Sequence, residues 1–291
     1  MGFSYEPIFA KIEITRRCNL DCEMCYRHAL GSIPNDMTLK QFKQIIDKTN
    51  FKRIATHGYG EPLIHPDFLE MMQYCQKKGV KTMLVTNGTL FTEELALGYL
   101  KTNPVSITFS IDSPHKEQYE KIRRGASFDR VMKNLKFIAD NRGNTKVRVH
   151  MTVWKENYKT VPEMKRLCKN MDIELGIADI TYSYDFKKSR EKNSVRNEMP
   201  KNEYRKCYLP WLSTYIDVEG DVYPCTDNLN WKLGSIYEKS MKEIYNSEKM
   251  RKFRELSVTG KNENCVKCSA WAPGDCPIVK RYLKKKMGLG R

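Results

Sequence analysis

The pattern that most constrains the fold is an alternation of short strand-like segments with amphipathic helical segments over the first two-thirds of the 291-residue chain. Six segments are short and rich in β-branched residues, as buried strands are. They are Ile8–Ile14, Arg53–Thr56, Lys81–Thr86, Val105–Ile111, Lys146–Val153 and Ile173–Ile180. Strands that alternate with helices pair in parallel through right-handed crossovers. The pattern therefore predicts an α/β fold built on one parallel sheet.

The segments between these strands carry helix signals. Thr38 followed by Gln41 is a capping-box pattern, which predicts a helix that runs through about Lys48. After Ser127, apolar residues recur at helical spacing. These are Phe128, Val131, Leu135 and Ile138.

The pattern changes after the sixth strand. Residues Tyr182–Lys201 are polar and basic without a clear period, which predicts a linker. Beyond it, LSTYIDVEGDVYPCT predicts two strands joined at Glu219-Gly220, and Met241–Leu256 predicts a helix. We therefore expect one domain over residues 1–190 and a smaller one over residues 201–291.

Composition excludes several classes of protein. No apolar stretch approaches the roughly 20 residues of a membrane helix, and the first residues lack a signal-peptide core. We therefore expect a cytoplasmic protein. The net charge of +16 would suit an anionic partner, but no nucleic-acid-binding motif accompanies it, so neither nucleic acid nor a membrane is an expected partner. The ten cysteines gather mainly in two clusters, which indicates metal binding in a reducing compartment.

Cys18, Cys22 and Cys25 have the spacing Cys-x3-Cys-x2-Cys and directly follow the first predicted strand. Active sites of β/α barrels gather at the carboxyl ends of the strands, where this loop falls. A four-iron cluster normally takes four cysteines, so three ligands leave one iron open to a reactive molecule. A zinc site completed from elsewhere in the chain is the alternative.

This spacing resembles the cluster motif of the radical S-adenosylmethionine (SAM) enzymes. The resemblance implies a partial (β/α)6 TIM-like barrel, with a small C-terminal β-hairpin-plus-helix domain for an auxiliary cluster. It implies that the three cysteines hold a 4Fe-4S cluster whose open iron is chelated by the amino and carboxylate groups of SAM. It also implies a flavodoxin- or ferredoxin-type electron donor and a 5′-deoxyadenosyl radical that removes a hydrogen atom from a substrate.

Further loops resemble SAM-contacting motifs of this family. Gly60-Glu61-Pro62 is similar to the GGEP motif, although Tyr59 stands where the family has its first glycine. The next strands end in Thr86-Asn87-Gly88 and in Ser110-Ile111-Asp112, similar to the family's TNG and SxD patterns. The cofactor-binding residues that the resemblance implies are Gly60, Glu61, Pro62, Asn87, Ser110 and Asp112.

Two more SAM contacts follow from the same resemblance. Relatives place an arginine on the SAM carboxylate, for which Arg123 and Arg124 are both candidates, and Arg123 is the one we name. The residue before the third cysteine is often aromatic in the family. Here it is Met24, with Tyr26 just after Cys25, and both are expected near the adenine.

The C-terminal cysteines resemble the SPASM/twitch extension that binds an auxiliary 4Fe-4S cluster. The resemblance rests on Cys207 and on Gly220-x4-Cys225 with YLPW between them. The metal ligands that it implies are Cys207, Cys225, Cys265 and Cys268, as in the shorter twitch variant. Cys276 is either a spare thiol or a replacement for one of the four, and zinc is the alternative metal. Cys75 and Cys168 lie on predicted barrel helices and are expected to be core thiols.

The predicted function is a radical SAM oxidoreductase that dehydrogenates a small molecule or carbohydrate, with the auxiliary cluster accepting the electron. The early start of the first strand favours this substrate class over a peptide. The alternatives are a peptide- or protein-modifying SPASM maturase, a molybdopterin-type nucleotide cyclase, and a zinc-bearing nucleic-acid-binding protein. No catalytic base can be identified, and His57, His65 and His150 are expected to be structural.

Overall fold

The structure is a computed structural model that describes residues 6–25, 27, 34–179, 207–262 and 265. A parallel sheet of six strands forms its centre, in the chain order that the sequence predicts. The strands are β1 (Phe9–Ile12), β3 (Arg53–Thr56), β4 (Lys81–Thr86), β5 (Ser106–Ser110), β7 (Lys146–Val153) and β8 (Glu174–Asp179). All six predicted strands are present, although β1, β5 and β8 are shorter than expected.

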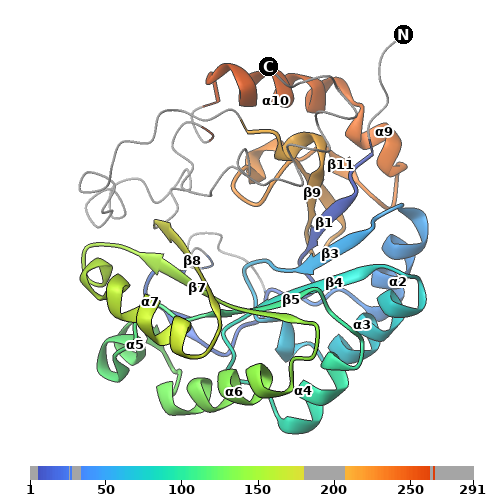
Figure 1. Ribbon diagram of the computed structural model, residues 1–291. Helices are drawn as coiled ribbons and strands as arrows, with labels where there is room; N and C mark the ends of the chain where they lie inside the picture. The colour runs from blue at the N-terminus through green and yellow to red at the C-terminus, as the bar shows by residue number, and fades with distance from the viewer. Residues whose placement is uncertain (1–5, 26, 28–33, 180–206, 263–264, 266–291) are drawn as a thin grey trace.

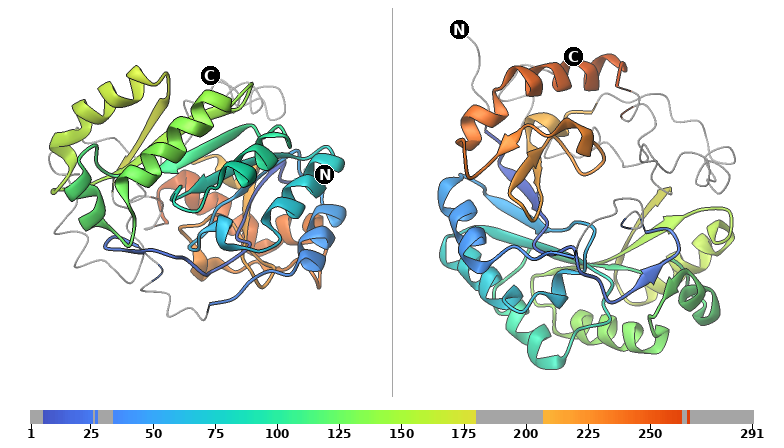
Figure 2. Two further views of the ribbon diagram at one scale, coloured as in Figure 1. Left: turned by 90° about the horizontal axis from the view of Figure 1, so that it is seen from below. Right: turned by 180° about the vertical axis from the view of Figure 1, so that it is seen from behind.

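Helices cover the outer face of this curved sheet (Figure 1, Figure 2). They are α2 (Leu39–Lys48), α3 (Phe68–Lys77), α4 (Glu93–Leu100), α5 (Lys116–Ile122), α6 (Phe128–Asn141) and α7 (Val161–Asn170), with short 3₁₀ turns η1 (Pro62–Ile64) and η2 (Tyr158–Thr160). The predicted capping box of α2 is present, because the Thr38 hydroxyl accepts from the Gln41 backbone and the Gln41 side chain accepts from the Thr38 backbone. Arranged this way, the strands and helices form the expected partial barrel.

The two faces of the sheet differ in polarity. Side chains alternate between the faces of a strand, and one set packs into the apolar core under the helices. That set includes Ala10, Ile12, Ile54, Leu84, Ile107, Phe109, Val147, Val149 and Met151. The other set faces the inside of the barrel and includes the half-buried Lys11, Ser110 and His150. The outer face of the sheet is thus mainly apolar, and the inner face carries polar groups beside apolar ones such as Met83.

The predicted hairpin is present and continues the barrel sheet. Strands β9 (Ser213–Ile216) and β10 (Asp221–Tyr223) are joined through Gly220, whose φ of 80° is favoured in glycine. β9 pairs in parallel with β1, whereas β10 pairs in antiparallel fashion with β9 and with β11 (Gly234–Ser235). One nine-stranded sheet therefore joins the barrel to the hairpin. The sequence alone gave no sign of this pairing. Two further 3₁₀ turns, η4 (Leu209–Trp211) and η5 (Leu229–Trp231), flank the hairpin.

The prediction of a single helix over Met241–Leu256 is wrong. The structure has two helices there, α9 (Met241–Tyr245) and α10 (Glu248–Thr259). The helix is interrupted between Tyr245 and Glu248, where the Ser247 hydroxyl caps α10 by accepting from the Met250 backbone. Each of the two helices thus has its own serine N-cap.

A two-stranded sheet lies outside the main sheet. It pairs β2 (Asp21–Cys22) with β6 (Arg123–Arg124) in antiparallel fashion. The predicted linker Tyr182–Lys201 lies outside the described residues. Among the described residues, no helix is long and apolar enough to cross a membrane.

We expect Ile216→Ala to lower the free energy of unfolding by about 2–5 kcal/mol, because truncation leaves a cavity at the junction of β9 and β1. The Ile216 side chain is fully buried and pairs in register with Ile12. Leu97→Ala, at an exposed position of α4, is the control and should change it by about 0.5 kcal/mol or less. Urea denaturation measures both. Equal losses in the two variants would contradict the packing of β9 against β1.

Candidate functional site

The three N-terminal cysteines lie together at the carboxyl end of β1. Cys22 is buried within β2, and the Cys25 backbone donates to the Cys22 carbonyl at 3.0 Å. Burial raises the pKa of the Cys22 thiol to about 11, and the charges of Cys18 and Cys25 add to this. The three thiols therefore lie within electrostatic range of one another. No three His, Cys, Asp or Glu side chains in the described part of the chain are close enough to hold a single metal ion. A four-iron cluster differs from a single ion because each thiolate binds a different iron. The fit to a cluster therefore rests on three thiols that lie within electrostatic range of one another.

Arg123 is the basic group beside this site. Its Nη1 lies 4.0 Å from Cys22 Sγ, and its Nε donates to Asp112 Oδ2 at 2.7 Å. The positive charge lowers the pKa of Cys22 against the larger effect of burial, so it favours the thiolate that binds metal. Arg124 is exposed and pairs with Asp21, which leaves Arg123 as the interior arginine of the two candidates.

Asp112 is fully buried and is already bonded to the protein's own groups. Besides Arg123, its carboxylate accepts from the Thr152 backbone at 2.7 Å, and its carbonyl accepts from Asn157 Nδ2 at 2.8 Å. The contact between the Asp112 side chain and SAM stays a prediction. The observed bonds make it a positioning group for Arg123. Ser110 is half-buried on the inner face of β5.

The Gly60-Glu61-Pro62 loop packs against the cysteine loop. A Cβ on Gly60 would lie 2.1 Å from the Thr15 carbonyl, so only glycine fits there. The Glu61 carboxylate is buried and accepts from Thr86 Oγ1 at 2.6 Å and from the Asn87 backbone at 2.7 Å. It therefore joins the loops that follow β3 and β4. Pro62 begins the turn η1.

Asn87 connects the loop after β4 to the cysteine loop. Its Nδ2 donates to Asn19 Oδ1 at 3.0 Å, and Asn19 Nδ2 donates to Thr89 Oγ1 at 2.9 Å. Asn19 directly follows Cys18, and sequence reasoning missed it. Met24 packs against Ile122 and Trp154.

Three of the C-terminal cysteines also converge. Burial raises the pKa of Cys265 to about 12, and the charges of Cys225 and Cys207 contribute. Cys225 follows β10, and its Sγ accepts from Asn228 Nδ2 at 3.1 Å. Asn262 Oδ1 accepts from the Cys265 backbone at 3.3 Å. These thiols fit an auxiliary cluster. The predicted residues Tyr26, Cys268 and Cys276 lie outside the described part of the chain.

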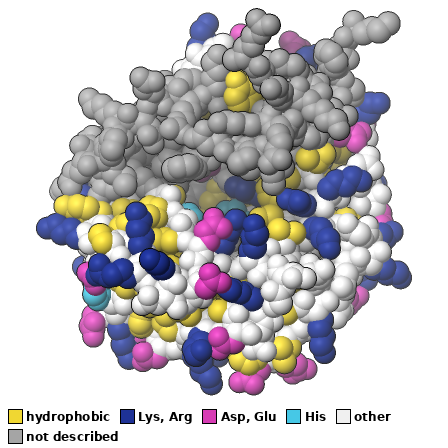
Figure 3. Space-filling view, in the orientation of Figure 1, with side chains coloured by type: hydrophobic (Ala, Val, Ile, Leu, Met, Phe, Trp, Pro, Cys, Tyr) yellow, Lys and Arg dark blue, Asp and Glu magenta, His cyan; other side chains and the backbone are white. Residues whose placement is uncertain are grey.

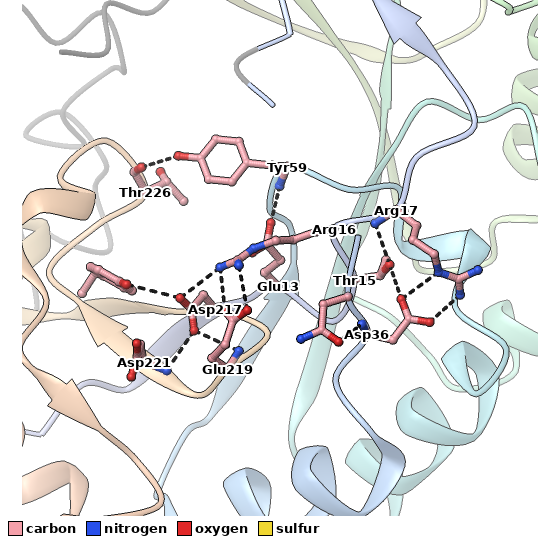
Figure 4. A network of polar contacts seen from close by, with 12 residues as sticks. Glu13, Thr15, Arg16, Arg17, Asp36, Tyr59, Asp217, Glu219, Asp221 and Thr226 are labelled. Carbon is pink, nitrogen blue, oxygen red and sulfur yellow. Dashed lines mark hydrogen bonds and ion pairs between the residues drawn. The ribbon is translucent and has the colours of Figure 1, made fainter. Parts of the chain in front are cut away.

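An ionic network joins the end of β1 to the hairpin (Figure 4). Arg16 donates to Glu13 at 3.1 Å, to Asp217 at 3.1 Å and to Glu219 at 2.7 Å. Tyr59, which replaces the family's glycine, donates from its hydroxyl to the Thr226 carbonyl at 2.7 Å. The loop after β3 is thus bonded to the residue that follows Cys225. Sequence reasoning missed both bridges, because Arg16 and Asp217 lie 201 residues apart.

Comparisons with known families agree with this geometry. Residues 12–168 match the radical SAM superfamily, and residues 207–269 match SPASM, an iron-sulfur cluster-binding domain. The first match covers more than half of the chain, which therefore belongs to the radical SAM superfamily. Membership implies a 4Fe-4S cluster and SAM, and the SPASM match implies auxiliary iron–sulfur binding. The predicted family and cofactors are confirmed, while the ligand roles and domain boundaries remain predictions.

Curated relatives include a cofactor-modifying protein, a bacteriocin biosynthesis protein and a maturase. The chain is 27% identical to the tungsten-containing aldehyde ferredoxin oxidoreductase cofactor-modifying protein of Pyrococcus furiosus, over 89% of this chain and 86% of that protein. It is 27% identical to the antilisterial bacteriocin subtilosin biosynthesis protein AlbA of Bacillus subtilis, over 93% of this chain and 66% of that protein. A third relative is the mycofactocin maturase MftC of Mycobacterium tuberculosis, 29% identical over 59% of this chain and 44% of that protein.

Solved structures share the fold. The structure of Streptococcus suis SuiB bound to S-adenosylmethionine has a TM-score of 0.69 at 17% identity, over 91% of this chain and 72% of that one. The structure of BtrN in complex with AdoMet and 2-DOIA has a TM-score of 0.60 at 17% identity, over 92% of this chain and 95% of that one. At these identities the likeness shows the fold alone, and it confirms the predicted partial barrel.

We expect Asp112→Asn to lower the free energy of unfolding by about 3–5 kcal/mol, because it leaves the buried Arg123 guanidinium without its charge partner. The control is Asp21→Asn, which removes the exposed partner of Arg124 and should cost about 1 kcal/mol or less. Chemical denaturation compares the two variants. A small effect of Asp112→Asn would show that Arg123 does not depend on this carboxylate.

Asp217 predicts a pH dependence of stability. Burial raises its pKa to about 7, and the Glu219 and Asp221 carboxylates add to the effect against Arg16. The folded protein then binds this proton more tightly than the unfolded chain, so stability falls as pH rises from about 4 to about 7. Asp217→Asn should remove this part of the slope in unfolding free energies measured across that range. An unchanged slope in the variant would contradict the assignment.

Proposed function

We propose that this chain is a SPASM-type radical SAM maturase that removes a hydrogen atom from a peptide or protein substrate. The observation that carries the proposal is that one hydrogen-bond network joins the loops of the two cysteine groups. Arg16 and the Tyr59 backbone both bond to Glu13, and the Tyr59 hydroxyl bonds to Thr226. Cys18 lies two residues after Arg16, and Cys225 directly precedes Thr226, the partner of Tyr59. The curated relatives, among them AlbA and the mycofactocin maturase, favour a maturation reaction.

Bound cluster and SAM would supply a 5′-deoxyadenosyl radical for hydrogen abstraction. The chain's own residues form the binding site for the cluster and SAM. Cys18, Cys22 and Cys25 would hold the cluster, and Arg123, held by Asp112, favours the ionised form of Cys22. Glu61 and Asn87 fix the loops around them through buried hydrogen bonds, which orients the binding site and excludes water.

The auxiliary thiols would complete the site from the hairpin side. Cys207, Cys225 and Cys265 are described, and Cys268 remains the predicted fourth ligand. The Arg16 and Tyr59 bridges hold this group at a fixed place relative to the N-terminal cysteines, as an electron acceptor requires. A flavodoxin- or ferredoxin-type protein is the proposed electron donor.

Oxidation of a small molecule or carbohydrate is the second candidate. The polar groups on the inner face of the barrel favour it, because half-buried Lys11, Ser110 and His150 suit a polar ligand of limited size. This reaction would use the same cysteines and the same bridges. The two candidates therefore differ only in what enters the barrel.

Anaerobic reconstitution tests the proposal. The wild type should bind about eight irons per chain and release 5′-deoxyadenosine when given dithionite and SAM. Replacing Cys18, Cys22 and Cys25 with alanine should leave about four irons and abolish the release. Cys75→Ala, in a core thiol of α3, is the control and should keep both properties.

Substrate screening separates the two candidates. Peptides encoded near the gene and small carbohydrates are incubated with the reduced protein and SAM, and mass spectrometry follows their modification. Modification of a peptide supports the maturase. Turnover of carbohydrates alone would replace it with the second candidate, and a wild type that releases no 5′-deoxyadenosine would overturn both.

A further inference from the structure

Lys11, His57 and His150 converge on the inside of the barrel. Lys11 lies on β1 between Ala10 and Ile12, which both point into the apolar core, so its side chain points to the inner face. His150 lies between the core residues Val149 and Met151 of β7 and therefore faces the same way. His57 directly follows β3, two residues after Ala55, which pairs in register with Lys11. Two strands and the residue that follows a third thus place these groups on the inner face of one sheet.

The three groups lie within electrostatic range of one another. Burial lowers the pKa of His57 to about 3, and the charges of Lys11 and His150 lower it further. Burial also lowers the pKa of His150, against Asp112, and Lys11 again contributes. Both imidazoles are therefore neutral near pH 7 and can donate one hydrogen bond each. Lys11 supplies the positive charge.

The three side chains are half-buried. Each keeps a solvent-accessible part although protein surrounds it. Small residues flank them in the neighbouring strands: Ala55 lies beside Lys11, and Gly176 lies beside His150. In Figure 3, histidine and basic side chains border a hollow in the face of the molecule. Half-buried polar groups with small neighbours suit the binding of a small polar group of a ligand.

Lys11 has no strong partner within the described part of the chain. Its Nζ lies 3.5 Å from Thr226 Oγ1, and no carboxylate of a described residue lies within 4.0 Å of it. Asp227 is the nearby opposing charge, since Lys11 lowers its pKa against the effect of burial. A partly buried ammonium without a close carboxylate is costly to leave unpaired. An incoming anion would supply that partner.

The position of this trio relates it to both cysteine groups. Lys11 acts electrostatically on Cys207, and His150 feels the charge of Arg123, which lies beside Cys22. Members of the trio therefore lie within electrostatic range of residues at both proposed cluster sites.

We propose that Lys11, His57 and His150 form an anion-binding cradle that holds a carboxylate or phosphate group of the substrate inside the barrel. This inference rests on the proposed function and adds the chemical class of the substrate. The ammonium pairs with the anion, and the two neutral imidazoles donate to its oxygens. A carboxylate would come from an acidic side chain or the end of a peptide, and a phosphate from a phosphorylated small molecule.

Calorimetry tests the cradle on the reconstituted, SAM-loaded protein without oxygen. One titration uses inorganic phosphate and the other uses acetate, so that the two anion sources are separated. The wild type should bind at least one of them, and Lys11→Met should weaken that binding about tenfold or more. Lys11→Arg keeps the charge and should retain most of it, while His150→Gln should give an intermediate loss.

The matched control is Lys81→Met, at the exposed first residue of β4, which should leave anion binding unchanged. Equal weakening in this control, or no binding of either anion by the wild type, would overturn the cradle. Release of 5′-deoxyadenosine is measured on the same samples. If the wild type releases 5′-deoxyadenosine but binds neither anion, only the cradle is contradicted. If the wild type releases no 5′-deoxyadenosine, the proposed function is contradicted.

Discussion

The pairing of β1 on both of its edges is the constraint on which the rest of the structure depends. β1 bonds in parallel to β3 on one side and to β9 on the other, so the barrel and the hairpin share one sheet. The cysteine loop leaves the end of this strand, and Arg16 reaches from it to the hairpin carboxylates. A shift of β1 by one residue would turn Lys11 into the apolar core and move the cysteines. One strand therefore sets both cluster sites and the inner face.

The alternation of side chains along the strands converts this frame into a reaction site. Strands of parallel sheets are often apolar on both faces, and TIM barrels fill their interior with branched side chains. Here the inner set is mixed, because it contains polar groups beside Ala55, Met83 and Val85. The inner set contains a lysine, histidines and hydroxyl groups that remain half-buried. These side chains consequently line the inside of the barrel. Buried hydrogen bonds of Glu61 and Asp112 hold the loops at the carboxyl ends of its strands.

Local patterns were enough to predict the strands, the first helix cap and the cysteine groups, because these depend on residues close in sequence. These local patterns could not predict contacts between segments that are far apart in the sequence. The β9–β1 pairing and the Arg16–Asp217 contact each join residues about 200 positions apart. Asn19, directly after Cys18, and Asn228, three residues after Cys225, were missed because an asparagine in such a loop resembles any turn residue. Arg123 and Arg124 became distinguishable only through the pairing of β6 with β2.

The claim at the centre of this account is that SAM occupies an iron that the polypeptide leaves free. Electron–nuclear double resonance on the reduced protein, with SAM labelled by ¹⁵N in its amino group and ¹⁷O in its carboxylate, examines that iron directly. The account predicts hyperfine coupling of both labels to the N-terminal cluster. Absence of coupling in a fully loaded, reduced sample, with every iron ligated by protein atoms, would contradict it.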